Sequence, residues 1–168
     1  MQEVTSDGLV FEFDDDWAVS KFDDWSYYRN QFIRISDGIK AVDLLACAPD
    51  KTTWMIEVKD YRLHRRTKLE DLGSEIARKV LFSLAAMLPA SLSSSALDEK
   101  AFAKRILRSK KLRVVLHLEQ PQHPTKLRPQ IIDPAHIQLK LRQILKCIDA
   151  HVIVVEVTNM RGLPWSVR

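Results

Sequence analysis

The chain has 168 residues, of which 46% are hydrophobic, so it is long and apolar enough to bury a core, and we expect residues 1–168 to form a single domain. Its net charge of +4 is compatible with nucleic-acid binding without requiring it. No run approaches the roughly 18 apolar residues that span a bilayer, and residues 1–16 are too acidic for a signal peptide, so we expect a cytoplasmic protein without a membrane partner.

The N-terminal segment predicts a short strand followed by an aromatic helix. Residues 9–13 alternate between apolar and polar side chains, which is typical of a strand. Asp23 or Asp24 could cap a helix that runs to residue 32. The aromatic residues of this helix recur at spacings of three and four: Trp25, Tyr28 and Phe32. Such a stripe is more typical of a buried core than of a surface that stacks on bases.

Residues 40–62 hold the most informative pattern of the sequence. Two apolar runs, at 41–47 and 52–59, are separated by the turn-forming residues 49–51, which predicts a β-hairpin. Charged residues interrupt these runs where a purely structural strand would carry Val or Ile: Asp43, Glu57 and Lys59. Three charges inside a predicted pair of buried strands need an explanation, either functional or structural.

The hairpin geometry predicts that the two carboxylates face each other. If residues 49–51 form the loop, Ala48 pairs with Thr52, and continuing that register brings Asp43 opposite Glu57. Directly opposed side chains have Cβ atoms about 4.5–5.5 Å apart, so both carboxylates could bind one cation. Lys59 shares a face with Glu57, because side chains alternate along a strand.

Clustered carboxylates beside a lysine suit metal-assisted phosphodiester hydrolysis. Mg²⁺ prefers oxygen ligands, is often held by one or two carboxylates, and lowers the pKa of a bound water. Lys59 could orient that water or stabilise the developing negative charge. The structural alternative is a cross-strand ion pair between Asp43 and Lys59, with Glu57 solvated beside it, which would contribute only about 0–1 kcal/mol.

At these residues, spaced as D-x₁₃-E-x-K, the chain resembles the PD-(D/E)XK phosphodiesterase superfamily of restriction-endonuclease-like and Holliday-junction-resolvase-like nucleases. The resemblance implies that Asp43 and Glu57, with the backbone carbonyl of Val58, bind Mg²⁺ or Mn²⁺, and that Lys59 assists catalysis. The chain departs from the nominal motif at Val42, where the motif has proline. Many such nucleases act as dimers, so the resemblance is also compatible with a homodimer.

The resemblance also directs attention to the helices on either side of the hairpin. In several relatives a helix before the hairpin adds an acidic residue to the metal site, and Asp23 and Asp24 are the local candidates. A second helix follows the E-x-K strand in the family. Here Thr67-x-x-Glu70 is a capping-box pattern, and apolar residues recur from 72 to 87 until Pro89, which predicts a helix that ends there.

Charged residues around this second helix could contact a metal-bound water or phosphate. Glu75 could steady the water, and Arg78 or Lys79 could hold phosphate. An ordinary pair between Glu75 and Lys79, four residues apart, explains the same pattern. The segment before the helix is strongly basic and could bind the backbone of a nucleic acid. Its candidates are Arg62, Arg65, Arg66 and Lys68.

The C-terminal half continues the alternation of helices and strands. Ser95-x-x-Asp98 could cap a helix whose basic side is either solvated or in contact with DNA. Residues 112–118 are an apolar run of strand length, Asp133-Pro134 is typical of a helix start, and residues 151–157 predict a last central strand. Together the elements predict an α/β fold with a mixed central β-sheet flanked by helices, in the order of the restriction-endonuclease-like fold.

Two main functions follow from this interpretation. The first is a divalent-metal-dependent nuclease that hydrolyses phosphodiester bonds of DNA. The second is a non-catalytic restriction-endonuclease-like domain that binds nucleic acid or protein. In the first the partner is a nucleic acid, and we expect DNA. A third hypothesis, a scaffold without nucleic-acid contact, predicts no salt-dependent DNA binding.

Overall fold

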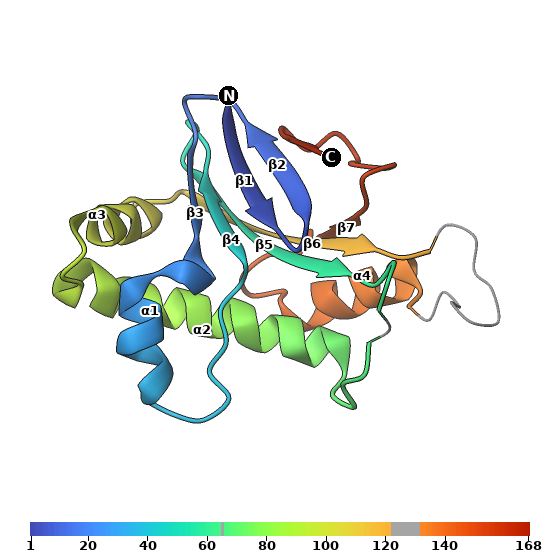
Figure 1. Ribbon diagram of the computed structural model, residues 1–168, viewed down its shortest axis with the longest axis horizontal. Helices are drawn as coiled ribbons and strands as arrows, with labels where there is room; N and C mark the ends of the chain where they lie inside the picture. Colours follow the sequence, from blue (N-terminus) through green and yellow to red (C-terminus); the bar gives the residue numbers. More distant parts are fainter. Residues whose placement is uncertain (65, 122–131) are drawn as a thin grey trace.

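A five-stranded mixed β-sheet forms the centre of the computed structural model, which describes residues 1–64, 66–121 and 132–168 (Figure 1). Its strands, in spatial order, are β3 (Ala18–Lys21), β4 (Leu44–Cys47), β5 (Thr52–Asp60), β6 (Lys111–Glu119) and β7 (Ile153–Val155). β3, β4 and β5 are antiparallel neighbours, whereas β5, β6 and β7 are parallel. The predicted α/β fold with a mixed sheet is confirmed, although β7 lies at an edge and not in the centre.

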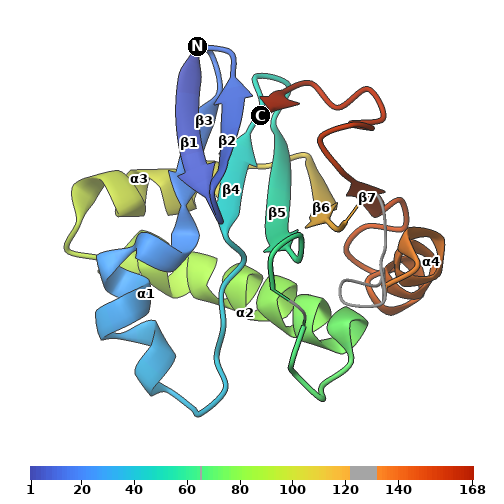
Figure 2. The ribbon, with the colours of Figure 1, turned by 45° about the vertical axis from the view of Figure 1, so that its right-hand side comes forward.

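Helices cover one face of this sheet (Figures 1 and 2). They are η1 (Phe22–Asp24), α1 (Ser26–Asn30), η2 (Phe32–Arg34), α2 (Leu72–Ser93), α3 (Leu97–Ile106) and α4 (Pro134–Ile144). The longest, α2, runs along this face and contacts both α3 and α4. The larger hydrophobic core lies between helices and sheet, and it includes Ile76 and Val80 of α2, Met55 of β5 and Leu116 of β6.

A small antiparallel sheet covers the opposite face. Its strands are β1 (Gln2–Ser6), β2 (Leu9–Phe13) and β8 (Ser166–Val167), with β2 in the middle. Both chain ends lie on this side of the molecule in Figure 1. Aromatic residues from this sheet and its loops pack over β5: Phe11, Phe13, Trp17 and Trp165. This layer covers the face that carries Ile56 and Val58, so Glu57 and Lys59, which alternate with them, lie on the other face.

β4 and β5 form the predicted hairpin in the predicted register. Leu44 pairs with Ile56, as the expected pairing of Ala48 with Thr52 requires. The Ala48 N–H donates a 2.9 Å hydrogen bond to the Thr52 carbonyl. Because Asp43 immediately precedes the first residue of β4, it enters the hairpin level with Glu57.

The boundaries predicted for α2 are wrong at both ends. The helix begins after Asp71, whose carboxylate accepts a 2.8 Å hydrogen bond from the Ser74 N–H, and the capping-box pattern at residues 67–70 is not used. Pro89 lies inside the helix and does not end it. The chain continues helically because Ala90 is fully buried against the core, which offsets the backbone hydrogen bond that proline removes.

The aromatic segment before the hairpin is more broken than predicted. Neither Asp23 nor Asp24 caps α1. Instead, the Glu99 carboxylate of α3 accepts hydrogen bonds from the N–H groups of Ser26, at 2.6 Å, and Tyr27, at 3.1 Å. The predicted aromatic stripe is nevertheless buried: Trp25, Tyr28 and Phe32. A tertiary contact therefore supplies the cap that a local carboxylate was expected to provide.

By length and composition alone, α2 is long and apolar enough to cross a bilayer, contrary to the expectation from the sequence. In the structure one face of α2 packs on the sheet, and Glu75 lies buried within the helix. A core helix of a soluble protein passes the same length and composition test, so this feature is weak support for a membrane span.

Candidate functional site

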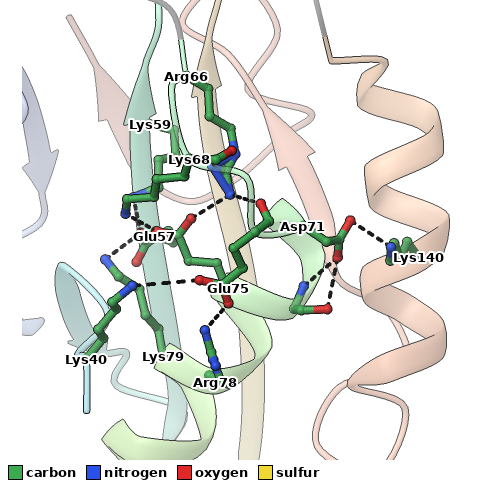
Figure 3. A network of polar contacts seen from close by, with 12 residues as sticks. Lys40, Glu57, Lys59, Arg66, Lys68, Asp71, Glu75, Arg78, Lys79 and Lys140 are labelled. Atoms are coloured by element: carbon green, nitrogen blue, oxygen red, sulfur yellow. Dashed lines mark hydrogen bonds and ion pairs between the residues drawn. The ribbon is translucent and has the colours of Figure 1, made fainter. Parts of the chain in front are cut away.

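Four charged side chains converge on the helical face of the hairpin. Glu57 and Lys59 project from β5 toward α2, from which Lys79 reaches back (Figure 3). Asp43 joins them from the segment that enters β4. The alternation along β5 explains this arrangement, because Val58, between the two β5 residues, packs into the aromatic core on the other face. The structure thus brings the three residues of the sequence motif together.

The Asp43 carboxylate is held by the neighbouring strand and by α2. Its Oδ2 accepts a 2.7 Å hydrogen bond from the Val58 N–H, and its Oδ1 lies 3.4 Å from Nζ of Lys79. The backbone carbonyl of Asp43 also accepts a hydrogen bond from the Phe22 N–H at 3.2 Å. The side chain remains 15% exposed, so solvent reaches it.

The Glu57 side chain is completely buried, and only one of its two carboxylate oxygens has hydrogen-bond partners among the described residues. Its Oε1 lies 2.5 Å from Nζ of Lys59 and 2.6 Å from Nζ of Lys79. Its Oε2 is buried and has no hydrogen-bond donor among the described residues. Burial, followed by the charge of Asp43, raises the pKa of Glu57 to about 7. A buried carboxylate oxygen without a donor is costly, which marks it as a position that a ligand could occupy.

The two lysines keep this acidic pair neutralised. Burial alone would lower the pKa of Lys59, but the carboxylates of Glu57 and Asp43 outweigh it and raise that pKa. Lys59 is 14% exposed and Lys79 is 11% exposed, so both ammonium groups lie at the edge of the site. The structural alternative, an ion pair between Asp43 and Lys59 beside a solvated Glu57, is wrong because Glu57 is buried and binds both lysines.

Glu75 anchors the basic loop instead of facing the carboxylate pair. Its Oε1 lies 2.6 Å from Nζ of Lys68, and its Oε2 accepts a 2.9 Å hydrogen bond from the Arg66 guanidinium (Figure 3). Burial alone would raise the pKa of Glu75, but the hydrogen bond from Lys68 and the charge of Lys59 lower it. The predicted pair between Glu75 and Lys79 is absent, because each residue has a partner from another element.

Most of the basic residues assigned to phosphate binding are occupied by carboxylates. Arg62 pairs with Asp60 at 2.7 Å, and Arg78 pairs with Glu70. Arg66 and Lys68 bind Glu75, and Lys79 binds both carboxylates of the hairpin. Arg65 lies outside the described residues. In the described residues these side chains already have carboxylate partners, with which phosphate would have to compete, and their assignment to phosphate binding stays a prediction; Lys68 is half exposed.

Of the two acidic residues proposed as accessory ligands, Asp23 approaches the site and Asp24 does not. Burial, followed by the charge of Asp43, raises the pKa of Asp23, and its buried Oδ1 has no donor among the described residues. Asp24 is turned outward, where it pairs with Arg29 and lies 3.3 Å from Nζ of Lys21. Only Asp23 is therefore coupled to the carboxylate pair.

The donor set fits a magnesium-type ion with few protein ligands. Asp43 and Glu57 offer carboxylate oxygens, and one oxygen of Glu57 has no donor from the part of the chain that the structure describes. The Val58 carbonyl faces Asp43, because the N–H and C=O of one strand residue point to the same side. In the part of the chain that the structure describes, no three His, Cys, Asp or Glu side chains cluster as a metal cage. Mg²⁺ is commonly bound by one or two carboxylates and water, so two suffice.

A second polar cluster on the opposite face of β6 is structural. The Glu119 carboxylate lies 2.9 Å from Nε2 of His117 and accepts a 2.7 Å hydrogen bond from the Val157 N–H. His117 is fully buried, as expected of a core histidine. This carboxylate ties the segment after β7 to β6.

The fold and the site define an α/β protein with a paired carboxylate and lysine cluster on a central hairpin. The chain is 30% identical, over 208 aligned positions, to a cysteine–tRNA ligase of Neisseria meningitidis serogroup A. The alignment covers 99% of this chain and 30% of that protein, so the chain spans less than a third of the relative's length. No protein-family model and no solved structure matches the chain.

Proposed function

We propose that the protein is a divalent-metal-dependent nuclease of the PD-(D/E)XK type that hydrolyses phosphodiester bonds of DNA. The observation that carries the proposal is the convergence of Asp43, Glu57 and Lys59 on a single hairpin, where one buried oxygen of Glu57 receives no hydrogen bond from any described residue. An α/β fold alone would support many functions, so the proposal depends on this site. The restriction-endonuclease-like topology and a homodimer belong to the same proposal.

Asp43, Glu57 and the Val58 carbonyl would hold Mg²⁺ or Mn²⁺. When bound, such an ion polarises the phosphate and lowers the pKa of a bound water. The ammonium of Lys59 is held in place by Glu57. It would orient the attacking water or stabilise the negative charge that develops on the phosphate in the transition state. Lys79, which lies against both carboxylates, would supply a second cation to the site when they hold a metal.

The second candidate is a non-catalytic domain that binds nucleic acid. It is favoured by Lys79, which already neutralises both carboxylates and so removes the need for a metal. The relative named as a cysteine–tRNA ligase acts, by its name, on tRNA, which adds RNA to the nucleic acids to be tested. Under this candidate, the charged cluster is a structural ion-pair network.

The test is cleavage of labelled duplex DNA, branched DNA and tRNA by the purified protein with Mg²⁺, Mn²⁺ or EDTA. We expect cleavage of DNA that requires metal and that falls by about 100-fold or more in Lys59→Ala. Lys146→Ala is the matched control, because Lys146 is exposed on the chain after α4 and away from the hairpin. Salt-sensitive binding without cleavage in any metal would favour the second candidate, and cleavage of tRNA alone would change the substrate.

A further inference from the structure

A basic cavity lies at the turn end of the hairpin, apart from the carboxylate cluster. It has a volume of about 470 Å³ and is lined by the β4–β5 turn and by the C-terminal part of α3. Among the described residues, four cations line it: Lys51 from the turn, Lys104 and Arg105 from α3, and Arg108 just after α3. Asp16 is the one acidic residue among the lining residues that the structure describes. Its remaining walls are small or apolar side chains of the turn and α3.

The cations of this cavity differ from those around Glu57 and Glu75 in having no carboxylate partner. Within residues 1–64, 66–121 and 132–168, none of Lys51, Lys104, Arg105 and Arg108 takes part in an ion pair. All four side chains are exposed. Like charges gathered around one cavity repel one another, and a bound anion would relieve that repulsion.

Hydrogen bonds hold the two walls of the cavity together. The Lys110 N–H donates a 2.9 Å bond to the Lys51 carbonyl, which joins the hairpin turn to the segment after α3. Two residues further along the hairpin from Lys51, the Thr53 hydroxyl is hydrogen-bonded to the Ser109 hydroxyl at 2.5 Å. Lys51 itself has a φ of +66°, so its backbone is set in the left-handed region by the turn. The cations are thus carried on a preformed frame and not on a free loop.

The geometry points to a nucleotide unit as the occupant: we propose that this cavity binds a phosphate ester of a nucleic-acid strand, with its sugar or base against the apolar wall. The volume lies within the roughly 300–1,000 Å³ of small-ligand sites and exceeds what one phosphate needs. Arg105 and Arg108 provide planar guanidinium groups, which suit bidentate phosphate contacts.

This site does not depend on the proposed nuclease activity. Glu57 lies six positions after Lys51 along the hairpin strand, which corresponds to about 20 Å. A nucleic acid that contacted both the basic cavity and the carboxylate cluster would therefore extend over about six base pairs of duplex at 3.4 Å each. The same chemistry could equally be supplied by a free mononucleotide, so the experiment has to separate the two sources.

The experiment measures fluorescence anisotropy of a labelled single-stranded oligonucleotide in EDTA, where no metal-dependent cleavage occurs. The pocket variant is Arg105→Ala with Arg108→Ala, and the control variant is Lys100→Ala with Lys146→Ala, which removes the same charge outside the cavity lining. We expect the Kd to rise about tenfold or more in the pocket variant and less than twofold in the control. The slope of log Kd against log salt should fall by about 0.7 for each phosphate that the variant no longer binds.

Two further measurements show whether the bound phosphate belongs to a nucleic-acid strand or to a free nucleotide, and whether it binds in the basic cavity. AMP is added as a competitor: failure to compete supports a strand, and competition at micromolar concentration supports a free nucleotide in the same cavity. In NMR titrations with the oligonucleotide, the amides of Lys51 and Ser109 should shift in the wild type. Equal weakening in both double variants, no oligonucleotide binding by the wild type, or shifts confined to other residues would each overturn the proposal, whether or not the protein cleaves DNA.

Discussion

The ammonium of Lys79 lies 2.6 Å from Oε1 of Glu57, so a cation of the protein itself sits between the carboxylates of the hairpin. The same Nζ is 3.4 Å from Oδ1 of Asp43. This relationship explains how two acidic side chains can share a largely buried position without a metal ion, because an unpaired buried charge would cost several kcal/mol. Under the proposed function, a divalent ion would therefore compete with Lys79 for the same oxygens.

Lys79→Met should weaken the metal-free fold and strengthen metal binding. Methionine keeps most of the apolar stem but removes the ammonium, so Glu57 retains only Lys59 as a partner. We expect the free energy of unfolding in EDTA to fall by about 2 kcal/mol, below the roughly 3–5 kcal/mol of a buried pair that loses its sole partner. Urea unfolding in EDTA and in MgCl₂ measures this.

Adding Mg²⁺ should raise the free energy of unfolding more in Lys79→Met than in the wild type. A metal that binds the folded state stabilises it by RT ln(1 + [L]/Kd), where [L] is the metal concentration, and we expect a lower Kd in the variant. Lys146→Met serves as the control for the substitution itself and should respond as the wild type does. A Lys79→Met protein that is as stable as the wild type in EDTA, and that gains nothing from Mg²⁺, would contradict the competition between ammonium and metal.

Glu75→Gln should destabilise the protein and release two cations. Arg66 and Lys68 both contact the buried Glu75 carboxylate, so the neutral amide leaves the Arg66 guanidinium without its ionic partner. We expect a loss of about 2–3 kcal/mol in urea unfolding. Salt-dependent binding of DNA should become tighter, because both cations become available to phosphate.

Glu70→Gln is the matched control for this prediction. It removes the carboxylate that pairs with Arg78 and lies 3.9 Å from Nζ of Lys40, and such partly exposed ion pairs contribute about 0–1 kcal/mol each. If both variants lost the same stability, or if DNA binding weakened in Glu75→Gln, the role of Glu75 as the anchor of the basic loop would be wrong.

Asp71→Ala should remove the N-cap of α2 in a manner that depends on pH. A hydrogen bond from Lys140, followed by that from the Ser74 N–H, lowers the pKa of Asp71 from 3.8 to about 2. Because the folded-state pKa lies below the unfolded value, its stabilising effect is present above pH 3.8 and is lost as the pH falls toward 2. The variant should lose about 1 kcal/mol at neutral pH.

Urea unfolding between neutral pH and pH 2 tests whether the stabilising effect of Asp71 decreases on acidification. The difference between wild type and Asp71→Ala should shrink as the pH decreases, by a modest amount because the carboxylate is 44% exposed to solvent. Asp71→Asn should retain much of the cap, since Asn is also a good N-cap residue. A stability difference that grew on acidification would refute the assigned direction.

Sequence reasoning was most successful where structure is set by neighbours along the chain. The turn at residues 49–51 determines the register of the hairpin, and that register alone brings Asp43 level with Glu57. Alternation then predicts correctly that Lys59 lies on the same face. The same local logic identified Asp133 as the N-cap of α4, whose side chain accepts a hydrogen bond from the Ala135 N–H.

Contacts between distant segments were beyond that reasoning. Glu99 caps α1 from 73 residues away in sequence, and Lys79 reaches Glu57 across 22 residues. No periodicity encodes such partners, since they depend on how α2 and α3 pack on the sheet. Strand β1 was missed because its alternation is carried by polar residues and is completed by pairing with β2. The basic loop was expected to be free for phosphate because the burial of Glu75 cannot be seen in sequence.

The central claim is that Asp43 and Glu57 bind a divalent cation, and a Mn²⁺ soak of protein crystals tests it most directly. We predict an anomalous difference peak within about 2 Å of a carboxylate oxygen from each residue, with Nζ of Lys79 displaced from Glu57. The Glu57→Gln crystal, soaked in the same way, should show no peak there. A wild-type map with Lys79 still bridging the two carboxylates and no Mn²⁺ beside them would contradict the account.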